Sequence, residues 1–273
     1  MGGAKPDALI LRIASAAVLA PVAAGAAWLG GYYFGALVVL AAVAMGWEWG
    51  RLTQGGGFGR AGATVVLTEM LAAAAAAAGE PRIGMAFLGA GVLALLVSPS
   101  LQQRAGTRVW AAIGALWIGT SCVALLWLAA EPGIGRQTVL WLFALVWATD
   151  SAAYLVGRLL GGPRLAPIWS PKKTWSGAIG GLAAGGAVGA VTAKLMGMPD
   201  YSPVIWVSLG LCVLEQMGDL AESAAKRRFG VKDTSGLIPG HGGILDRVDG
   251  MLAVVTVVAA LALIRGASPL AWG

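Results

Sequence analysis

Residues 108–130 read RVWAAIGALWIGTSCVALLWLAA, a run in which Arg108 is the only charged side chain. An α-helix needs roughly 20 apolar residues to cross about 30 Å of hydrocarbon, so this run is long enough to span a membrane. The whole chain of 273 residues is 58% hydrophobic and only 12% charged, whereas soluble domains carry about 25% charged residues. This composition excludes both a soluble globule and a disordered chain.

Eight more apolar runs of similar length occur along the chain. None of them shows the alternating pattern of a lipid-exposed barrel strand. We therefore expect an all-α fold, a polytopic transmembrane helical bundle of about nine spans that forms a single integral membrane domain over residues 1–273. The further runs lie at residues 10–29, 32–49, 61–79, 83–100, 137–160, 174–196, 202–225 and 246–265.

The positive charges predict the orientation of this bundle. If the N-terminus is cytoplasmic, nine spans place the C-terminus outside, and 15 of the 19 Lys and Arg residues fall on the cytoplasmic side. This split follows the positive-inside rule. The first run could also be read as a signal peptide, but it extends to about Gly30 and more spans follow it.

The polar residues are distributed unevenly between two parts of the chain. Residues 1–140 contain few of them, and we expect these spans to serve packing and dimer formation; Glu48 and Glu69 have no clear role there. Residues 141–273 contain the dense charged segments and are expected to be catalytic. The glycines between residues 177 and 189 are spaced to let helix backbones approach closely, which predicts a packing face.

Acidic residues inside apolar spans are costly and are by default functional or paired. Glu215, Asp219 and Glu222 follow the spacing i, i+4 and i+7, so they share one helical face. Stacked carboxylates repel one another and need a cation or protons, and Mg²⁺ prefers such hard oxygen ligands. The alternative is a stack of salt bridges with the basic residues that follow.

A second acidic pair, Asp246 and Asp249, opens the last span at the spacing i and i+3. Favourable interaction with the helix dipole would explain both residues structurally. The functional interpretation is that this pair faces Asp219 across a hairpin and completes a metal site.

The segment between the two acidic groups combines glycines with cations. Glycines at positions 230, 236, 240, 242 and 243 would let backbone N–H groups approach an oxyanion. Carboxylates for Mg²⁺ beside cations for phosphate are the recurring parts of phosphoryl-transfer sites. His241 either orders the glycine turn or donates to a phosphate oxygen. The surrounding cations are Lys226, Arg227, Lys232 and Arg247.

Another polar group precedes the glycine-rich helix. Asp150 lies within an apolar run, and Lys172 and Lys173 lie in a segment that we expect on the cytoplasmic side. The two lysines are placed where a substrate phosphate could dock. The alternative is that they only flank a span as positive-inside charges.

Residues 223–249, which read SAAKRRFGVKDTSGLIPGHGGILDRVD, resemble the signature of the phosphatidate cytidylyltransferases, also called CDP-diacylglycerol synthases. The upstream segments around Asp150, residues 170–174 and residues 218–223 are also similar to that family, so the resemblance covers about residues 147–250, with the signature proper at residues 218–249. One departure is Ser176, where family members usually carry Glu or Gln.

The resemblance implies a reaction in phospholipid biosynthesis, in which CTP and phosphatidate give CDP-diacylglycerol and pyrophosphate. It also implies Mg²⁺ dependence, K⁺ as a second cation, and a homodimer in the cell inner (plasma) membrane with its active site facing the cytoplasm. No nucleic acid partner is expected.

On this basis we assign roles to the polar residues. Asp219, Asp246, Lys226 and Arg247 are expected to be catalytic, and Asp219, Glu222, Asp246 and Asp249 to bind the metal. The expected substrate-binding residues are Ser223, Lys226, Arg227, Lys232, Asp233, His241, Gly242, Gly243, Lys172, Lys173 and Asp150.

Two other functions remain as alternatives. A CTP-dependent lipid-alcohol kinase would transfer the γ-phosphoryl group and release CDP. An ion-coupled transporter would use the buried acids as an ion path, but it would favour broken helices in both halves of the chain.

Overall fold

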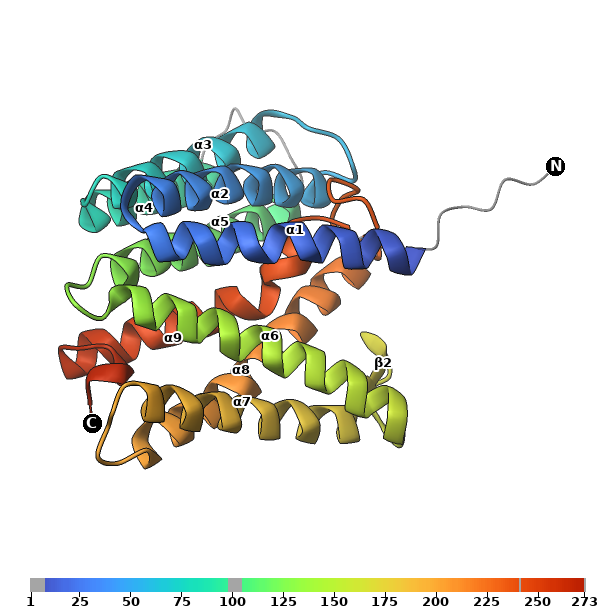
Figure 1. Cartoon of the computed structure of the whole chain (residues 1–273). Coiled ribbons are helices and arrows are strands. Elements are labelled where there is room, and N and C mark those ends of the chain that lie inside the picture. Colours follow the sequence, from blue (N-terminus) through green and yellow to red (C-terminus); the bar gives the residue numbers. More distant parts are fainter. Residues whose placement is uncertain (1–7, 98–104, 241, 273) are drawn as a thin grey trace. The chain divides into compact units, whose positions relative to one another are not determined.

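A computed structural model describes residues 8–97, 105–240 and 242–272. Over these residues the fold is all-α, as the sequence predicts, and each expected apolar run coincides with one helix (Figure 1). Two short strands, β1 (Arg164–Ala166) and β2 (Ser170–Thr174), and the 3₁₀-helix η1 (Pro269–Ala271) accompany the helices. The helices are α1 (Ala8–Leu29), α2 (Gly31–Thr53), α3 (Arg60–Ala77), α4 (Pro81–Val97), α5 (Ala105–Ala129), α6 (Gly135–Leu160), α7 (Trp175–Leu195), α8 (Ser202–Arg228) and α9 (Leu245–Arg265).

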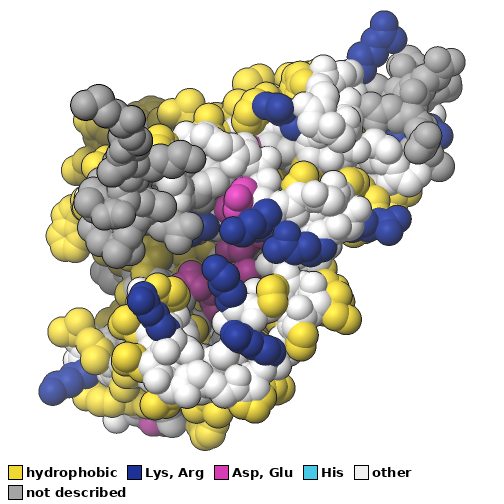
Figure 2. Space-filling model, turned by 90° about the vertical axis from the view of Figure 1, so that its right-hand side faces the viewer, with side chains coloured by type: hydrophobic (Ala, Val, Ile, Leu, Met, Phe, Trp, Pro, Cys, Tyr) yellow, Lys and Arg dark blue, Asp and Glu magenta, His cyan; other side chains and the backbone are white. Residues whose placement is uncertain are grey.

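Seven of the described helices are long and apolar enough to cross a membrane, namely α2, α3 and α5 to α9. Helix α4, with 17 residues, and the part of α1 from Ser15 to Leu29 are shorter apolar helices. Many large apolar side chains are exposed, among them Tyr32, Leu93 and Leu263. Hydrophobic side chains on the face shown in Figure 2 appear in yellow. An apolar exterior of this kind suits a polytopic membrane protein.

The chain forms two compact units. The first comprises Met1–Trp127 together with Arg228–Val248, and the second comprises Leu128–Arg227 together with Asp249–Gly273. The segment between α8 and α9 therefore belongs to the first unit, although it follows a helix of the second.

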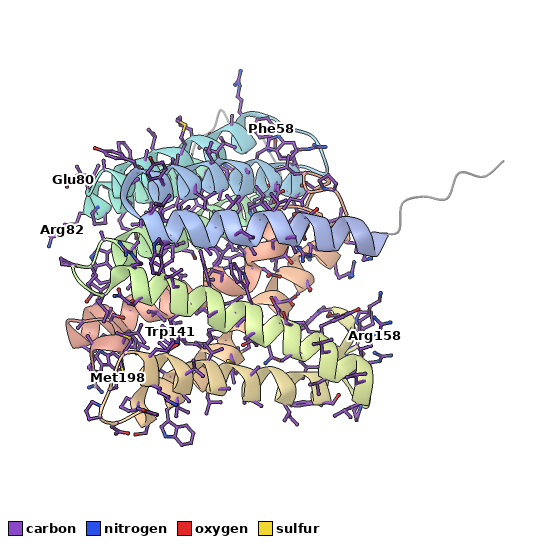
Figure 3. The ribbon with its side chains drawn as sticks, viewed as in Figure 1. Phe58, Glu80, Arg82, Trp141, Arg158 and Met198 are labelled. Atoms are coloured by element: carbon purple, nitrogen blue, oxygen red, sulfur yellow. The ribbon has the colours of Figure 1, made fainter. Side chains whose placement is uncertain are left out.

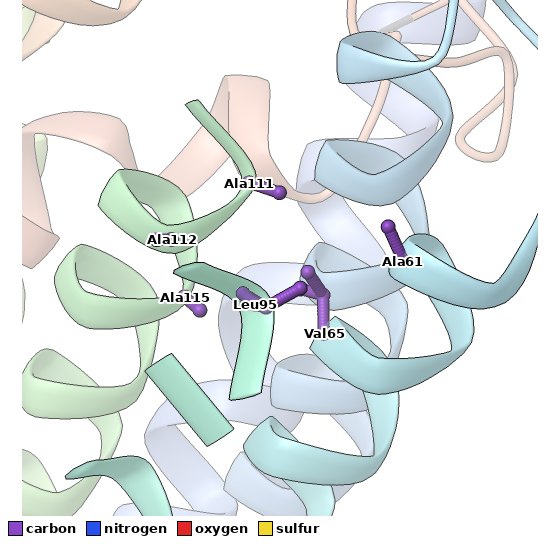
Figure 4. Packing of buried hydrophobic residues seen from close by; sticks show 6 residues of the cluster. All are labelled: Ala61, Val65, Leu95, Ala111, Ala112 and Ala115. Atoms are coloured by element: carbon purple, nitrogen blue, oxygen red, sulfur yellow. The ribbon is translucent and has the colours of Figure 1, made fainter. Parts of the chain in front are cut away.

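In the first unit, α2 packs against α1 and α3, and α3 packs against α4. A Cβ atom at Gly50 would lie 2.7 Å from the Cα atom of Gly62, so the close approach of α2 and α3 requires glycine there. Small and aliphatic side chains fill the core between α3, α4 and α5 (Figure 4). That cluster consists of Ala61, Val65, Leu95, Ala111, Ala112 and Ala115.

In the second unit, α7 packs along α6 with its glycine face. Gly177, Gly181, Gly185 and Gly189 are all buried. A Cβ atom at Gly177 would lie 2.6 Å from the carbonyl oxygen of Ala153, which no side chain tolerates. The predicted packing role of this glycine stretch is confirmed.

A short β-hairpin precedes α7, a feature that the sequence analysis did not anticipate. Strand β1 pairs with β2 in antiparallel orientation, with Arg164 opposite Thr174 and Ala166 opposite Ser170. The Thr174 hydroxyl then accepts a hydrogen bond from the amide of Gly177 and caps α7. The hairpin thus fixes where Lys173 lies relative to the helices of its unit.

The connecting loops alternate between opposite ends of the helices within each unit (Figure 3). In the first unit, Phe58 lies before α3, and Glu80 and Arg82 lie beyond its other end. In the second unit, Arg158 near the end of α6 and Met198 beyond α7 lie at opposite ends. This alternation agrees with the up-and-down order that the charge distribution implies; which end faces the cytoplasm stays a prediction.

Candidate active site

Helix α8 carries the principal acidic face of the second unit. Glu215, Asp219 and Glu222 recur at the spacing that places them on one side of the helix, as expected. Glu215 and Glu222 are buried, whereas the Asp219 side chain is 24% exposed. Asp219 is therefore the most accessible of the three carboxylates.

The β-hairpin brings Lys173 to this face. Its Nζ atom lies 2.5 Å from Oδ2 of Asp219, and the hydroxyl of Ser223 donates to Oδ1 of Asp219 at 3.3 Å. Burial alone would lower the pKa of the Lys173 ammonium, but the carboxylates of Asp219, Glu215 and Asp150 outweigh burial and raise that pKa above its ordinary value. Lys173 is thus held in its charged form beside Asp219.

Asp150 of α6 and Glu215 of α8 hydrogen-bond to each other through their carboxyl groups. Gly250 of α9 packs directly on Glu215, because a Cβ atom at position 250 would lie 2.8 Å from its Cγ. Helices α6, α8 and α9 therefore converge on one acidic cluster within this unit.

Two further expected site residues belong to the same cluster. Glu222 is fully buried and forms an ion pair with Lys226 one turn later on α8. Asp249 accepts a hydrogen bond from the amide of Gly250 at 2.8 Å, and it interacts electrostatically with Asp219, Asp150 and Lys226. Glu222 therefore forms a salt bridge with a basic residue that follows it, as the alternative to metal binding predicts. Asp219 and Asp249 are partly exposed.

In the first unit, Asp246 organises the loop that precedes α9. Its Oδ2 accepts hydrogen bonds from the amide of Thr234 at 2.9 Å, from the Thr234 hydroxyl at 2.9 Å and from the amide of Gly243 at 2.7 Å. A Cβ atom at Gly242 would lie 2.6 Å from the same oxygen, and Gly242 has a positive φ of 83°. Glycine is therefore required where the loop turns over this carboxylate.

Glu48 of α2 is the second carboxylate inside this loop. It is completely buried. Its Oε1 accepts from the Ser235 hydroxyl at 2.6 Å and the amide of Ile244 at 2.9 Å, and its Oε2 accepts from the amide of Leu245 at 2.8 Å. The amide of Gly243, one of the expected oxyanion donors, donates to Asp246 in this structure, and the amides of Ile244 and Leu245 donate to Glu48.

The remaining expected cations are exposed. Lys172 on the hairpin, Arg227 near the end of α8, Lys232 in the loop and Arg247 in the first turn of α9 all present their side chains to the surface, as does the acidic Asp233. Exposed cations are available to polyanionic ligands. His241, which we expect to bind substrate, lies outside the described residues.

The side chains expected to bind a metal have the right donor chemistry, since all of them offer the hard oxygen ligands that Mg²⁺ prefers. They are Asp219, Glu222, Asp246 and Asp249. In the part of the chain that the structure describes, no three His, Cys, Asp or Glu side chains are gathered closely enough to hold an ion. Asp246 belongs to the first unit, and the other three to the second. Each of the four carboxylates already has a protein partner. Asp219 and Glu222 form salt bridges with Lys173 and Lys226. Asp246 accepts from the amides of Thr234 and Gly243, and Asp249 accepts from the amide of Gly250. Metal binding therefore stays a prediction.

Sequence reasoning left Glu48 without a role. The available signal was an acidic residue in an apolar run, which is by default functional or paired, but this signal does not identify the partners. Those partners lie as many as 197 positions away in the chain. Glu69 of α3 is also fully buried, but neither of its carboxylate oxygens has a hydrogen-bond partner among the described residues.

The sequence of this chain is similar to those of known proteins of one family. The profile of the Cytidylyltransferase family matches residues 10–264. A phosphatidate cytidylyltransferase of Brucella suis is 43% identical over 251 residues, which is 90% of each chain, and one of Brucella abortus is 42% identical over the same share. A phosphatidate cytidylyltransferase of Staphylococcus haemolyticus is 40% identical over 140 residues, covering 50% of this chain and 53% of the relative.

Proposed function

The chain belongs to the Cytidylyltransferase family, and from that premise we propose that the charged clusters described above transfer the cytidylyl group of CTP to phosphatidate. The protein is a membrane-embedded nucleotidyltransferase of phospholipid biosynthesis. The observation that carries the reaction is the 43% identity over 90% of both chains to a relative named for this activity.

The reaction needs little covalent help from the protein. A phosphate oxygen of phosphatidate attacks the α-phosphorus of CTP, a new P–O bond forms, and the bond from the α-phosphorus to the bridging oxygen breaks to release pyrophosphate. The attacking monoester is already ionised near pH 7, because its second pKa is about 6. Positioning of two polyanions and stabilisation of the developing charge therefore dominate the catalytic task.

The cations of the chain suit that task. We assign Lys226 and Arg247 to the charge on the reacting phosphates, Arg227 and Lys232 to docking of CTP, and Lys172 to docking of phosphatidate. The exposure of Arg227, Lys232, Arg247 and Lys172 supports this assignment, since a ligand can reach them without unfolding the site. Lys173 keeps Asp219 neutralised in the structure described here.

We further propose that Mg²⁺ is held by Asp219 and Asp246, with Glu222 and Asp249 as additional ligands. Bound Mg²⁺ supplies charge neutralisation to the triphosphate and to the leaving pyrophosphate. The support is the all-oxygen donor set and the partial exposure of Asp219. We also propose K⁺ as a second cation and a homodimer in the inner membrane, as the resemblance implies, and a cytoplasm-facing site, which the distribution of Lys and Arg supports as well.

The test is an assay of the purified protein in lipid vesicles with CTP, phosphatidate and Mg²⁺, in which both products are resolved. We expect pyrophosphate and CDP-diacylglycerol in equal amounts. Formation of CDP and a phosphorylated lipid alcohol from diacylglycerol would instead identify the kinase alternative. A matched reaction with diacylglycerol in place of phosphatidate serves as the control and is expected to give no product.

A further inference from the structure

Glu48 connects α2 to the loop that carries several of the proposed substrate-binding residues. Besides the three hydrogen bonds at 2.6–2.9 Å described above, the Thr234 hydroxyl donates to Oε2 at 3.4 Å. All four donors belong to residues 234–245, so a single side chain of α2 holds both ends of this segment.

The donors explain why a carboxylate is needed at this point. The amides of Ile244 and Leu245 lie at the beginning of α9, where helix N–H groups lack intrahelical partners. A negative charge beside these amides also interacts favourably with the helix dipole. Because Glu48 is 0% exposed, water cannot replace it, and loss of the acceptor leaves the buried amide of Leu245 unsatisfied.

The loop also packs directly on the carboxylate. A Cβ atom at Gly243 would lie 2.5 Å from Oε1 of Glu48, so the backbone at position 243 can approach this closely only without a side chain. Asp246 accepts the amide of Gly243 from the other side at 2.7 Å. The segment is thus fastened between one carboxylate from α2 and one from α9.

We infer that Glu48 is a positioning residue for catalysis: it fixes the segment of residues 234–245 on α2 and thereby sets the placement of Lys232, Asp233 and Arg247 toward the nucleotide. This inference rests on the proposed function for its kinetic consequence. Its structural consequence, the local stability of the loop, is independent of the activity.

The experiment compares Glu48→Gln with Glu69→Gln. Glutamine keeps the size of the side chain but replaces one accepting oxygen by a donating NH₂ group, which opposes the loop amides. Glu69 is the matched control because it is an equally buried glutamate of the same unit that has no hydrogen bond to the loop. Each variant and the parent are reconstituted in vesicles, and the concentration of folded protein is measured before the assay.

Hydrogen exchange of peptides that contain Gly243–Leu245 is the first readout. We expect these amides to exchange about tenfold or more faster in Glu48→Gln than in the parent, whereas peptides from the core of α6 keep the parent rate. In Glu69→Gln the loop peptides are expected to exchange at the parent rate. If the peptides that contain Gly243–Leu245 exchange at the same rate in Glu48→Gln and in the parent, the inference is overturned.

The second readout is kinetic. Per folded protein, kcat/KM for CTP is expected to fall about tenfold to hundredfold in Glu48→Gln, with the KM for phosphatidate unchanged. A purely structural residue would change only the folded fraction, so unchanged kcat and KM values also overturn the inference. A parent that lacks cytidylyl transfer contradicts the proposed function instead, and the exchange readout then still decides whether Glu48 holds the loop.

A milder variant covers the case in which Glu48→Gln does not fold. Ser235→Ala removes one donor to the same carboxylate and leaves both loop amides in place. We expect faster exchange of Ile244 and Leu245 in this variant, by a smaller factor. Parent-like exchange in Ser235→Ala would overturn the inference.

Discussion

The Lys173 ammonium, at the end of a short hairpin, lies 2.5 Å from the carboxylate of Asp219 on α8. The neighbouring Lys172 points instead to the surface. Two adjacent lysines that look equivalent in the sequence therefore have different surroundings, and they are expected to contribute differently to the reaction.

Replacement of each lysine tests this difference. In Lys173→Met, Asp219 loses its partner and the carboxylates around it are left uncompensated. A charge-assisted hydrogen bond is worth about 1.5–3 kcal/mol, so kcat/KM for both substrates should fall about tenfold to hundredfold. Steady-state kinetics with each substrate varied in turn would measure the effect.

Lys172→Met is the matched comparison for that experiment. Because Lys172 is exposed and unconstrained by α8, its loss should raise only the KM for phosphatidate. Identical kinetic defects in the two variants would contradict the separation of the lysines, and a defect of Lys172→Met in CTP binding would contradict its assignment to the lipid substrate.

The proposed metal ligands predict a stronger effect. Asp219→Asn and Asp246→Asn should each remove nearly all turnover, because an amide oxygen is a weaker ligand for Mg²⁺ than a carboxylate. Expression and thermal stability should remain close to those of the parent. The measurement is turnover per folded protein as a function of Mg²⁺ concentration.

Asp200→Asn provides a control for these aspartate substitutions. Asp200 lies in the exposed loop before α8, where hydrogen bonds from Ser202 lower the pKa of its carboxyl group. The side-chain oxygen of asparagine can still accept from the amide and the hydroxyl of Ser202, and the position lies in an exposed loop, so activity should be unchanged. Substantial turnover in Asp219→Asn or Asp246→Asn would remove that residue from the metal site.

The close contact of α2 and α3 predicts that a larger residue at position 50 lowers the thermal stability of the protein. In Gly50→Ala the new methyl group would lie 2.7 Å from the Cα atom of Gly62, and overpacking of this kind costs typically about 1–3 kcal/mol. The Tm in detergent should fall accordingly. Gly25→Ala is the control, because a Cβ atom there meets no other atom within 4 Å; an equal loss of Tm in both variants would refute the packing argument.

The alternation of loop ends predicts accessibility from opposite sides of the membrane. Phe58→Cys should be labelled by an impermeant thiol reagent only from the cytoplasmic side, and Glu80→Cys only from the outside. Both positions are exposed, whereas the native Cys122 and Cys212 are buried and should give little background. Labelling of both new cysteines from one side would show that α3 does not cross the membrane.

Much of the architecture follows from local properties of the sequence. The run at residues 202–225 predicts α8 because its length and apolarity suit a membrane-spanning helix, and the helix observed spans Ser202–Arg228. The shared face of Glu215, Asp219 and Glu222 is equally local, since it depends only on helical geometry. The family is identifiable for the same reason, because its signature lies in one continuous segment.

What only the tertiary structure decided is which residues pair with Glu48 and Lys173. Glu48 accepts hydrogen bonds from Ile244 and Leu245, which lie 196 and 197 positions further along the chain, and Lys173 reaches Asp219 because an unforeseen hairpin turns it toward α8. Such pairings depend on which distant segments the packing of helices brings together. The sequence by itself determined that these charges need partners, since a buried ion without one is costly; the packing determined which residues supply them.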